Sequence, residues 1–252
     1  MKNFVLECCI DSVNSAVNAE KGGATRLELC SNLIIGGTTP SPYLFKEVRK
    51  HTNLPIHVLI RPRFGDFCYD AYEKEIMCRE IRMFRELGAD AAVIGALRPD
   101  GTLDIEAMKM LREAAGKMKI TLHRAFDVCK DPYAAMEEGI SLGIHTILTS
   151  GQENNCLAGS RLLNDLLQKA DGRIEIMAGA GVDAAAIRYL TGRMPLRCFH
   201  MSGKVTRDSS MKYRKQGVNM GLPSLSEFEI WETSEEKVRE AREVLETVWE
   251  KN

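Results

Sequence analysis

The chain has no long hydrophobic run and almost no net charge. Its first apolar stretch, Phe4-Val5-Leu6, ends at Glu7, so the hydrophobic region of a secretory signal is missing. No later stretch approaches the roughly 20 apolar residues of a membrane-spanning helix. The 34 basic and 35 acidic side chains give a net charge of −1, which provides no field to attract a polyanion. We therefore expect no membrane and no nucleic acid as partners.

The chain also lacks CxxC pairs, although it has eight cysteines. Without a secretory signal, we expect a cytoplasmic protein, in which thiols stay reduced. A cysteine there is a core residue, a metal ligand or a nucleophile rather than half of a disulfide. We expect most of the eight in the core.

Short strand-like runs alternate with longer amphipathic segments along the whole chain. One such segment, 73–88, has an apolar stripe that includes Ile76 and Phe84, and glycines such as Gly88 and Gly143 mark helix ends. The strands are expected at 4–9, 25–30, 55–61, 91–96, 119–124, 145–150, 173–178 and 197–202. Eight such units without a break in composition predict an α/β fold, a (β/α)8 TIM barrel formed as a single domain over residues 1–252. A doubly wound open sheet is the alternative, but it usually stops at five or six strands.

A long polar stretch, 203–233, follows the eighth predicted strand. It is too long for an ordinary connection, so we expect a lid, a contact within a homo-oligomer or partial disorder. From Lys204 to Lys215 it carries five basic side chains against one acid, which suits either an anionic ligand at the barrel mouth or a solvated loop. A C-terminal helix is expected over about 234–250, with Thr233 and Glu236 as its capping pair.

Two of the predicted strands carry an acid and a thiol two residues apart. Glu7 and Cys9 share one face of the first strand, and Glu28 and Cys30 share one face of the second, because side chains alternate along a strand. The apolar faces pack on the helices, so these four side chains should point into the barrel. Converging carboxylates and thiols suit soft-metal binding or acid/base catalysis.

The same alternation predicts an unusually polar barrel interior. Barrel interiors are generally filled by Val, Ile and Leu, and a buried charge is costly without a partner. The side chains expected inside are Glu7, Cys9, Arg26, Glu28, Cys30, His57, Arg61, Thr121, His123, Glu175, His200 and Ser202. They form either a structural network of Glu–Arg and His–Glu pairs or the lining of an active or binding cavity.

Loops after several strands add candidate ligand-binding groups. Arg61 and Arg63 stand on a proline-stiffened turn, and arginine grips carboxylate or phosphate. His123 is followed by Asp127, which could orient this histidine or an arginine, and such a histidine suits general-base work or metal ligation. Small residues after the last three strands leave backbone N–H groups for an anion, as in barrel phosphate sites. These anion-binding candidates are Ser150, Gly179, Gly181 and Ser202.

Several short segments are highly specific as a group, although none would suffice singly. They are Glu28-Leu29-Cys30, Gly36-Gly37-Thr38-Thr39-Pro40-Ser41, Ile60-Arg61-Pro62-Arg63, Gly65-Asp66-Phe67, Gly95-Ala96-Leu97, His123-Arg124-Ala125-Phe126-Asp127 and Leu148-Thr149-Ser150-Gly151-Gln152. With these segments the chain resembles the CutC copper homeostasis family over nearly its whole length. The resemblance implies a (β/α)8 barrel, a cytoplasmic location and a role in copper handling, with Cu(I) bound through cysteines. Cys9 and Cys30 occupy family-like positions, whereas Phe64 and Ala180 stand where the family has glycine.

The residues leave two main hypotheses for function. The first is a cytosolic copper-binding homeostasis protein with Cys9 and Cys30 as ligands of Cu(I), although two thiols are few ligands for a copper site. The second is an isomerase, lyase or hydrolase that acts on a small anionic or phosphorylated metabolite at the carboxyl end of the barrel. A third and plainer interpretation is a barrel that serves only as an oligomeric scaffold.

In the enzyme hypothesis, the polar interior supplies the catalytic groups. Glu7 and Glu28 would act as acid/base groups or as ligands of a divalent metal. His123 would be a base oriented by Asp127, and His200 would be a further catalytic group. Arg61 and Arg63 would hold the substrate.

Overall fold

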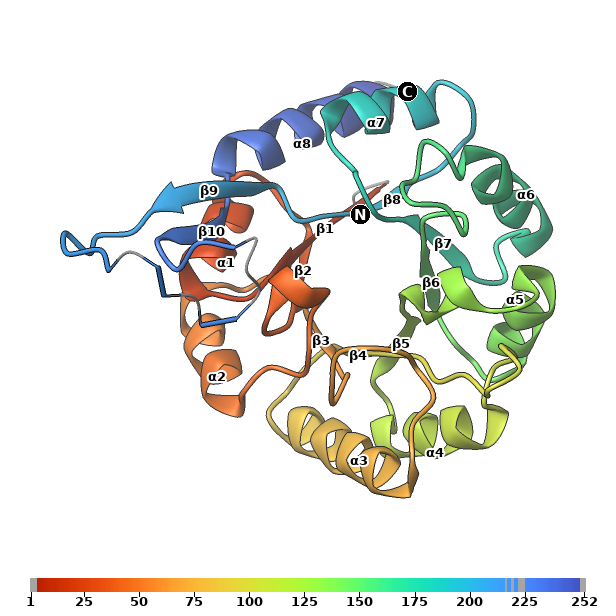
Figure 1. Ribbon diagram of the computed structural model, residues 1–252. Coiled ribbons are helices and arrows are strands. Elements are labelled where there is room, and N and C mark those ends of the chain that lie inside the picture. Colours follow the sequence, from red (N-terminus) through yellow and green to blue (C-terminus); the bar gives the residue numbers. More distant parts are fainter. Residues whose placement is uncertain (1–3, 216, 219, 222–224, 250–252) are drawn as a thin grey trace.

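A computed structural model describes residues 4–215, 217–218, 220–221 and 225–249. Eight parallel strands form a closed barrel in sequence order (Figure 1). They are β1 (Val5–Ile10), β2 (Arg26–Leu29), β3 (Ile56–Leu59), β4 (Ala91–Ile94), β5 (Lys119–Leu122), β6 (Thr146–Thr149), β7 (Glu175–Ala178) and β8 (Cys198–Met201). Each strand overlaps its predicted range, and the predicted (β/α)8 TIM barrel is confirmed.

An outer ring of helices surrounds the strands (Figure 1). The helices are α1 (Val13–Lys21), α2 (Pro42–His51), α3 (Ala71–Glu86), α4 (Ile105–Ala115), α5 (Pro132–Ser141), α6 (Ser160–Ala170), α7 (Ala184–Thr191) and α8 (Glu235–Trp249), with short 3-10 turns η1 (Leu33–Ile35) and η2 (Arg124–Val128). Helix α8 packs against both α7 and α1 and thereby closes the ring. None of the described helices is long and apolar enough to cross a membrane.

Local sequence sets where the helices begin and end. Asp70 and Glu73 form a reciprocal capping box at the start of α3, and Pro42 occupies the first helical position of α2. After α3 and α5, Gly88 and Gly143 take left-handed φ angles of 83° and 70°. These glycines end the helices as the sequence predicts.

Strand alternation separates an outer apolar core from a mixed interior. Leu6, Leu27 and Val58 belong to the large core between strands and helices, whereas Glu7 and Glu28 are buried inside the barrel. The interior is less polar than predicted. Leu59 and Val93 pack on Cys30, and a second small cluster joins Leu148, Met177 and Cys198. On α3, the predicted stripe is wrong at Ile76, which is 47% exposed.

The polar stretch 203–233 contains an antiparallel hairpin of β9 (Lys204–Asp208) and β10 (Glu229–Thr233), while residues 216, 219 and 222–224 lie outside the described residues. The hairpin is fastened to α1. Asn18 Nδ2 donates to the Thr233 carbonyl at 3.0 Å, and the Thr233 N–H donates to Ser15 Oγ at 3.1 Å. Long-range contacts with α1 therefore order a segment that sequence reasoning treats as a loop.

The start of the C-terminal helix differs from the predicted one by one or two positions. Thr233 belongs to β10, and its Oγ1 donates to the Ser202 carbonyl at 3.1 Å. Helix α8 begins at Glu235, and Ser234 Oγ accepts the Lys237 N–H at 3.3 Å. The predicted capping pair of Thr233 and Glu236 is wrong, because the hairpin takes Thr233 into a strand.

We predict that Gly22→Ala destabilises the closure between α1 and α8. A Cβ at Gly22 would lie 2.6 Å from both the Glu235 carbonyl oxygen and Val238 Cβ, and such overpacking costs about 1–3 kcal/mol. Gly192 is a matched control, because it has the same helical φ but its nearest atom would lie at 3.3 Å. Urea unfolding should show a loss for Gly22→Ala that clearly exceeds the loss for Gly192→Ala. Equal stability of the two variants would contradict this account of the closure.

Candidate functional site

A cavity of about 340 Å³ opens at the carboxyl end of the barrel. Strand ends supply most of its polar wall, namely Cys9, Glu28, Cys30, Arg61, His123 and His200. The hairpin closes one side with Lys204, Trp231 and Glu232. Parallel barrels place binding and catalytic groups at this end of the strands.

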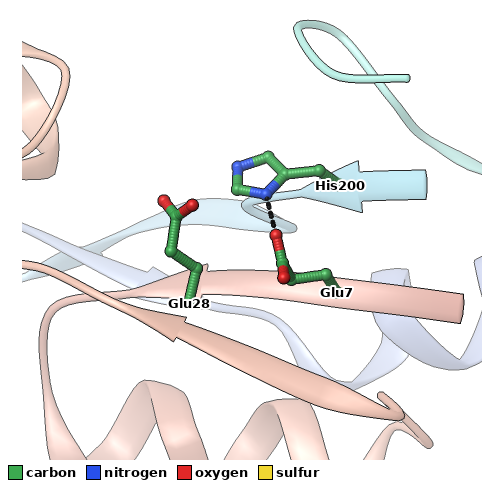
Figure 2. A group of neighbouring side chains, drawn as sticks. All are labelled: Glu7, Glu28 and His200. Carbon is green, nitrogen blue, oxygen red and sulfur yellow. Dashed lines mark hydrogen bonds and ion pairs between the residues drawn. The ribbon is translucent and has the colours of Figure 1, made fainter. Parts of the chain in front are cut away.

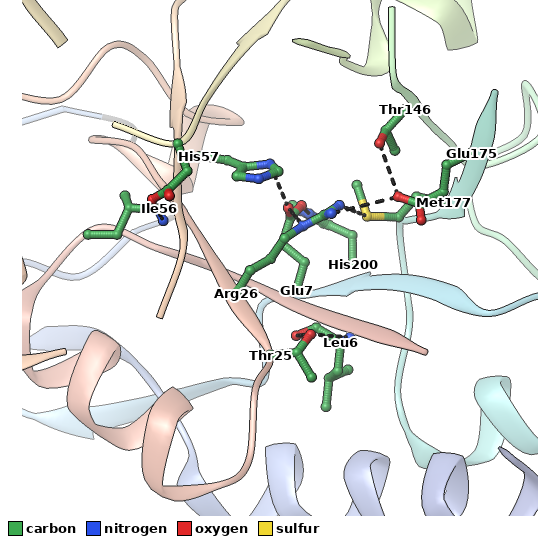
Figure 3. Close-up of polar contacts among 11 residues, drawn as sticks. Leu6, Glu7, Thr25, Arg26, Ile56, His57, Thr146, Glu175, Met177 and His200 are labelled. Atoms are coloured by element: carbon green, nitrogen blue, oxygen red, sulfur yellow. Dashed lines mark hydrogen bonds and ion pairs between the residues drawn. The ribbon is translucent and has the colours of Figure 1, made fainter. Parts of the chain in front are cut away.

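Glu7 is the centre of a charged network beneath the cavity. It is fully buried on β1, and its carboxylate accepts hydrogen bonds from Arg26 Nε at 2.5 Å and from His200 Nδ1 at 2.7 Å (Figure 3). His57 Nδ1 lies 3.5 Å from the same carboxylate. Burial by itself raises the pKa of Glu7, but Arg26 and the two histidines outweigh burial and lower the pKa. Glu7 is therefore an anion that neighbouring strands hold in place.

The second partner of Arg26 is on the far side of the barrel. Arg26 Nη1 lies 3.7 Å from Glu175 Oε2, which also accepts the Thr146 hydroxyl at 3.0 Å (Figure 3). Burial, the largest influence, lowers the pKa of His57 to about 4, with Arg26 adding to the effect. His57 is therefore neutral at pH 7. The structural network expected of the interior exists at this depth.

Glu28 lies one layer closer to the cavity than this network. Its Oε2 is buried and has no hydrogen-bond partner among the described residues. Burial raises the pKa of Glu28 to about 7, although His200 opposes the shift. One ligand atom from each of Glu7, Glu28 and His200 lies within 4.8 Å of the others (Figure 2). This triad has the donor types and spacing that a metal ion needs.

The thiols of Cys9 and Cys30 stand on the same wall as the triad. Cys9 Sγ donates to the Met201 carbonyl at 3.6 Å, and Cys30 Sγ donates to the Ile10 carbonyl at 3.5 Å. Burial raises the pKa of Cys30 well above its ordinary value. Burial also opposes the charged form of His200, but the neighbouring Cys9 and Glu28 outweigh it and raise the pKa of His200. The wall thus combines sulfur, oxygen and nitrogen donors.

The opposite wall, just after the ends of β3 and β5, is basic and aromatic. Arg61 is 7% exposed and lies over the Phe67 ring, with Cζ 5.0 Å from the ring centroid. The Phe67 and His123 rings are 4.9 Å apart. Burial, and then the charge of Arg61, lower the pKa of His123 to about 3, so its ring is neutral at pH 7. A cation and a neutral histidine therefore face the acidic wall.

The structure does not bring every predicted site residue to the cavity. Arg63 points to the start of α3, where it pairs with Glu73 at 2.5 Å and with Asp66 at 2.9 Å. Gly179 is not part of the cavity lining. A Cβ at this position would lie 2.6 Å from Leu148 Cδ1, so the glycine leaves room for the Leu148 side chain.

Asp127 and Ser150 are bonded to each other rather than to a ligand. The Asp127 carboxylate accepts the backbone N–H of Ser150 at 2.9 Å and the Thr149 hydroxyl at 2.5 Å, and it pairs with Arg124 at 2.6 Å. Asp127 therefore does not orient His123, whose Nδ1 accepts the Ala125 N–H instead. The loop N–H groups that resembled an anion site already hold an internal carboxylate.

Gly181 and Ser202 do line the cavity, together with residues that sequence reasoning missed. Asp11 follows β1 directly and could have been found from that position alone. No sequence pattern pointed to Trp231 and Glu232, because only the folding of the hairpin against α1 brings them to the cavity.

The fold and site define a (β/α)8 barrel with a charged interior and a cavity of about 340 Å³ at its carboxyl end. The sequence model of the CutC family matches residues 4–205, and the chain belongs to this family. It is 44% identical to the copper homeostasis protein cutC homolog of Homo sapiens over 94% of this chain and 87% of that protein. A CutC family protein of Bacteroides fragilis (strain YCH46) is 42% identical over 97% of this chain and 98% of that protein.

Solved structures agree with this family and with the fold. A CutC structure from Streptococcus agalactiae has a TM-score of 0.75 and 32% identity, and the match covers 79% of this chain and 98% of that one. Thiamine phosphate pyrophosphorylase from Pyrococcus furiosus has a TM-score of 0.58 at 13% identity, with 98% of each chain covered. At that identity the second likeness shows only a shared barrel.

We predict that Glu7→Gln severely destabilises the barrel. The change preserves the shape of the side chain but removes the closest counter-ion of Arg26, whose own side chain is only 11% exposed. Breaking a buried ion pair in this way costs about 3–5 kcal/mol. Glu47→Gln is the control, because Glu47 forms an ion pair on the exposed face of α2 and should barely alter urea unfolding. A small effect of Glu7→Gln would refute a central role for this carboxylate.

We also predict that buried His123 makes stability depend on pH. Below the ordinary histidine pKa of 6.5 the unfolded chain binds a proton, whereas folded His123 stays neutral down to about pH 3. Its contribution is complete above pH 6.5 and decreases as pH falls, with a slope of up to about 1.4 kcal/mol per pH unit. His123→Phe should flatten the plot of unfolding free energy against pH between 6 and 4, whereas exposed His51→Gln should not. If the unfolding free energies of His123→Phe and of the parent protein had identical slopes against pH, buried His123 would not be the cause of the pH dependence.

Proposed function

We propose that this protein binds copper in the cavity at the carboxyl end of its barrel and acts in copper homeostasis. The observation that carries the proposal is the donor wall, where Cys9, Cys30, Glu28 and His200 meet at one cavity. Membership of the CutC family, whose human and mouse relatives are named copper homeostasis proteins, supports copper as the proposed metal. The alternative of an inert, internally paired interior explains the Glu7 network but not the buried Glu28 oxygen, which has no partner among the described residues.

The proposal assigns the thiols to Cu(I) and the triad to a divalent ion. Cu(I) prefers soft thiolate ligands, so Cys9 and Cys30 are its proposed ligands. The carboxylates and imidazole of Glu7, Glu28 and His200 are harder donors that suit Cu(II) or another divalent metal. Glu7 already accepts bonds from Arg26 and His200, so within the triad it has a second proposed part, which is to orient His200 from behind.

The proposal includes the cytoplasm as the location. All eight cysteines are free thiols, a state that a reducing compartment maintains. The expected homo-oligomer stays a prediction, which sedimentation of the purified protein would test.

We predict that the wild type withdraws Cu(I) from a chromophoric chelator under anaerobic conditions. Cys9→Ser/Cys30→Ser should weaken Cu(I) binding by at least about tenfold, or about 1.4 kcal/mol. Cys78→Ser/Cys156→Ser is the matched control, because those thiols are also buried but lie outside the cavity. Binding that survives loss of Cys9 and Cys30 would contradict the thiol site. Titration of Glu28→Gln with Cu(II) then shows whether the triad is the metal site instead.

A second candidate function is acid/base catalysis as an isomerase, lyase or hydrolase. The specific observation is the pair of neighbouring carboxyl groups whose pKa values are driven apart, that of Glu7 downward and that of Glu28 up to about 7. Such a pair separates a permanent anion from a group that can give or take a proton at neutral pH. In this proposal Glu28 is the acid/base group, and the basic wall holds the substrate.

A further inference from the structure

Arg61 is a buried cation whose donors are only partly used. Its Nη1 donates to the carbonyls of Gly36 and Gly37 at 3.3 and 3.1 Å, and its Nη2 donates to the Gly65 carbonyl at 2.7 Å. A guanidinium has five N–H donors. The Nε–H is buried and has no partner among the described residues.

The charge of Arg61 has no counter-ion among the described residues. No carboxylate oxygen of these residues lies within 4.0 Å of its guanidinium nitrogens, the distance limit for an ion pair. The neighbouring Tyr69 is neutral, because burial raises the pKa of its phenol to about 12. The Phe67 ring contacts the cation but is also neutral. By contrast, Arg124 and Arg63 each pair with an aspartate.

A second unused donor stands beside Arg61. His123 Nδ1 accepts the Ala125 N–H at 3.1 Å, so in the neutral ring the proton is on Nε2. That Nε2–H is buried and has no partner among the described residues. The backbone leaves little freedom for the ring, since a Cβ on Gly95 would lie 2.6 Å from His123 Cε1. A fixed neutral donor and an unpaired cation therefore share one wall of the cavity.

We propose that the β3–β5 wall is a subsite for the oxyanion head of a small organic molecule, a carboxylate or a phosphate. Arg61 supplies the charge, and His123 Nε2–H supplies a neutral hydrogen bond. Arg124 also lines the cavity. The cavity of about 340 Å³ has room for a metabolite-sized molecule. This inference goes beyond copper binding, because the subsite lies opposite the donor wall and uses none of its ligands.

The loop after β6 is a poor alternative place for the anion. Asp127 already occupies the N–H groups of Ser150 and Gln152 in this loop at 2.9 and 3.3 Å. The proposal therefore rests on the unused donors of Arg61 and His123 rather than on this glycine-containing turn.

The experiment is calorimetric titration of the metal-free, full-length protein with inorganic phosphate and, separately, with malonate, at fixed ionic strength in chloride. We expect saturable binding of at least one probe. Phosphate binding identifies a phosphoryl head, and malonate binding identifies a carboxylate head. Arg61→Met and His123→Phe should each weaken binding, by at least about tenfold for Arg61 because a charged hydrogen bond is lost. Circular dichroism verifies that each variant is folded.

Arg63→Gln is the matched control, because Arg63 is two residues away but points outside the cavity. It should bind the probe as the wild type does. The inference is overturned if neither probe binds at up to about 10 mM, where a millimolar Kd would be nearly saturated. It is also overturned if the Arg61 and His123 variants bind normally, or if Arg63→Gln loses as much affinity as Arg61→Met. The titration uses no copper, so its outcome is independent of the Cu(I) competition.

Discussion

The buried carboxylate of Glu7 is the interaction on which the rest of the site depends. Burying a charge costs several kcal/mol unless it is paired and fully hydrogen-bonded, and Arg26 and His200 both bond to this one group. The three residues come from β2, β1 and β8, on both sides of the point where the chain closes the barrel. The same bonds fix the His200 ring through Nδ1, so that only its other nitrogen is free for chemistry at the cavity. The hydrogen bonds of Glu7 thus both stabilise the barrel and fix the geometry of the site.

The cavity above Glu7 has two walls of different character. Acids and thiols from β1 and β2 form one wall, and Arg61 and His123 from β3 and β5 form the other. The donors of the first wall suit a cation, whereas the donors of the second suit an anion. The two proposals therefore place a metal ion and an organic anion in one cavity, which joins the copper interpretation and the enzyme interpretation in one site.

Strand periodicity made the barrel and its inner groups predictable, because every second residue of a strand must face inward. It predicts that Glu7, Glu28 and His200 all face the barrel interior. Loop residues were not predictable in this way. Arg63 and Asp127 have the right chemistry, but their direction depends on partners such as Glu73 and the Ser150 N–H, which only tertiary structure brings near. The hairpin was missed for the same reason, since its order comes from α1.

The energetics of Arg61 explain how a subsite can be stable without its ligand. Three carbonyl hydrogen bonds to a charged group are each worth about 1.5–3 kcal/mol, and a desolvated cation–π contact with Phe67 adds about 2 kcal/mol. Together these offset much of the cost of burying the charge, so the fold tolerates Arg61 alone. They do nothing for the Nε–H of Arg61 or the Nε2–H of His123. Each unsatisfied donor costs about 1–3 kcal/mol, and an oxyanion in the cavity would recover that free energy from both donors at once.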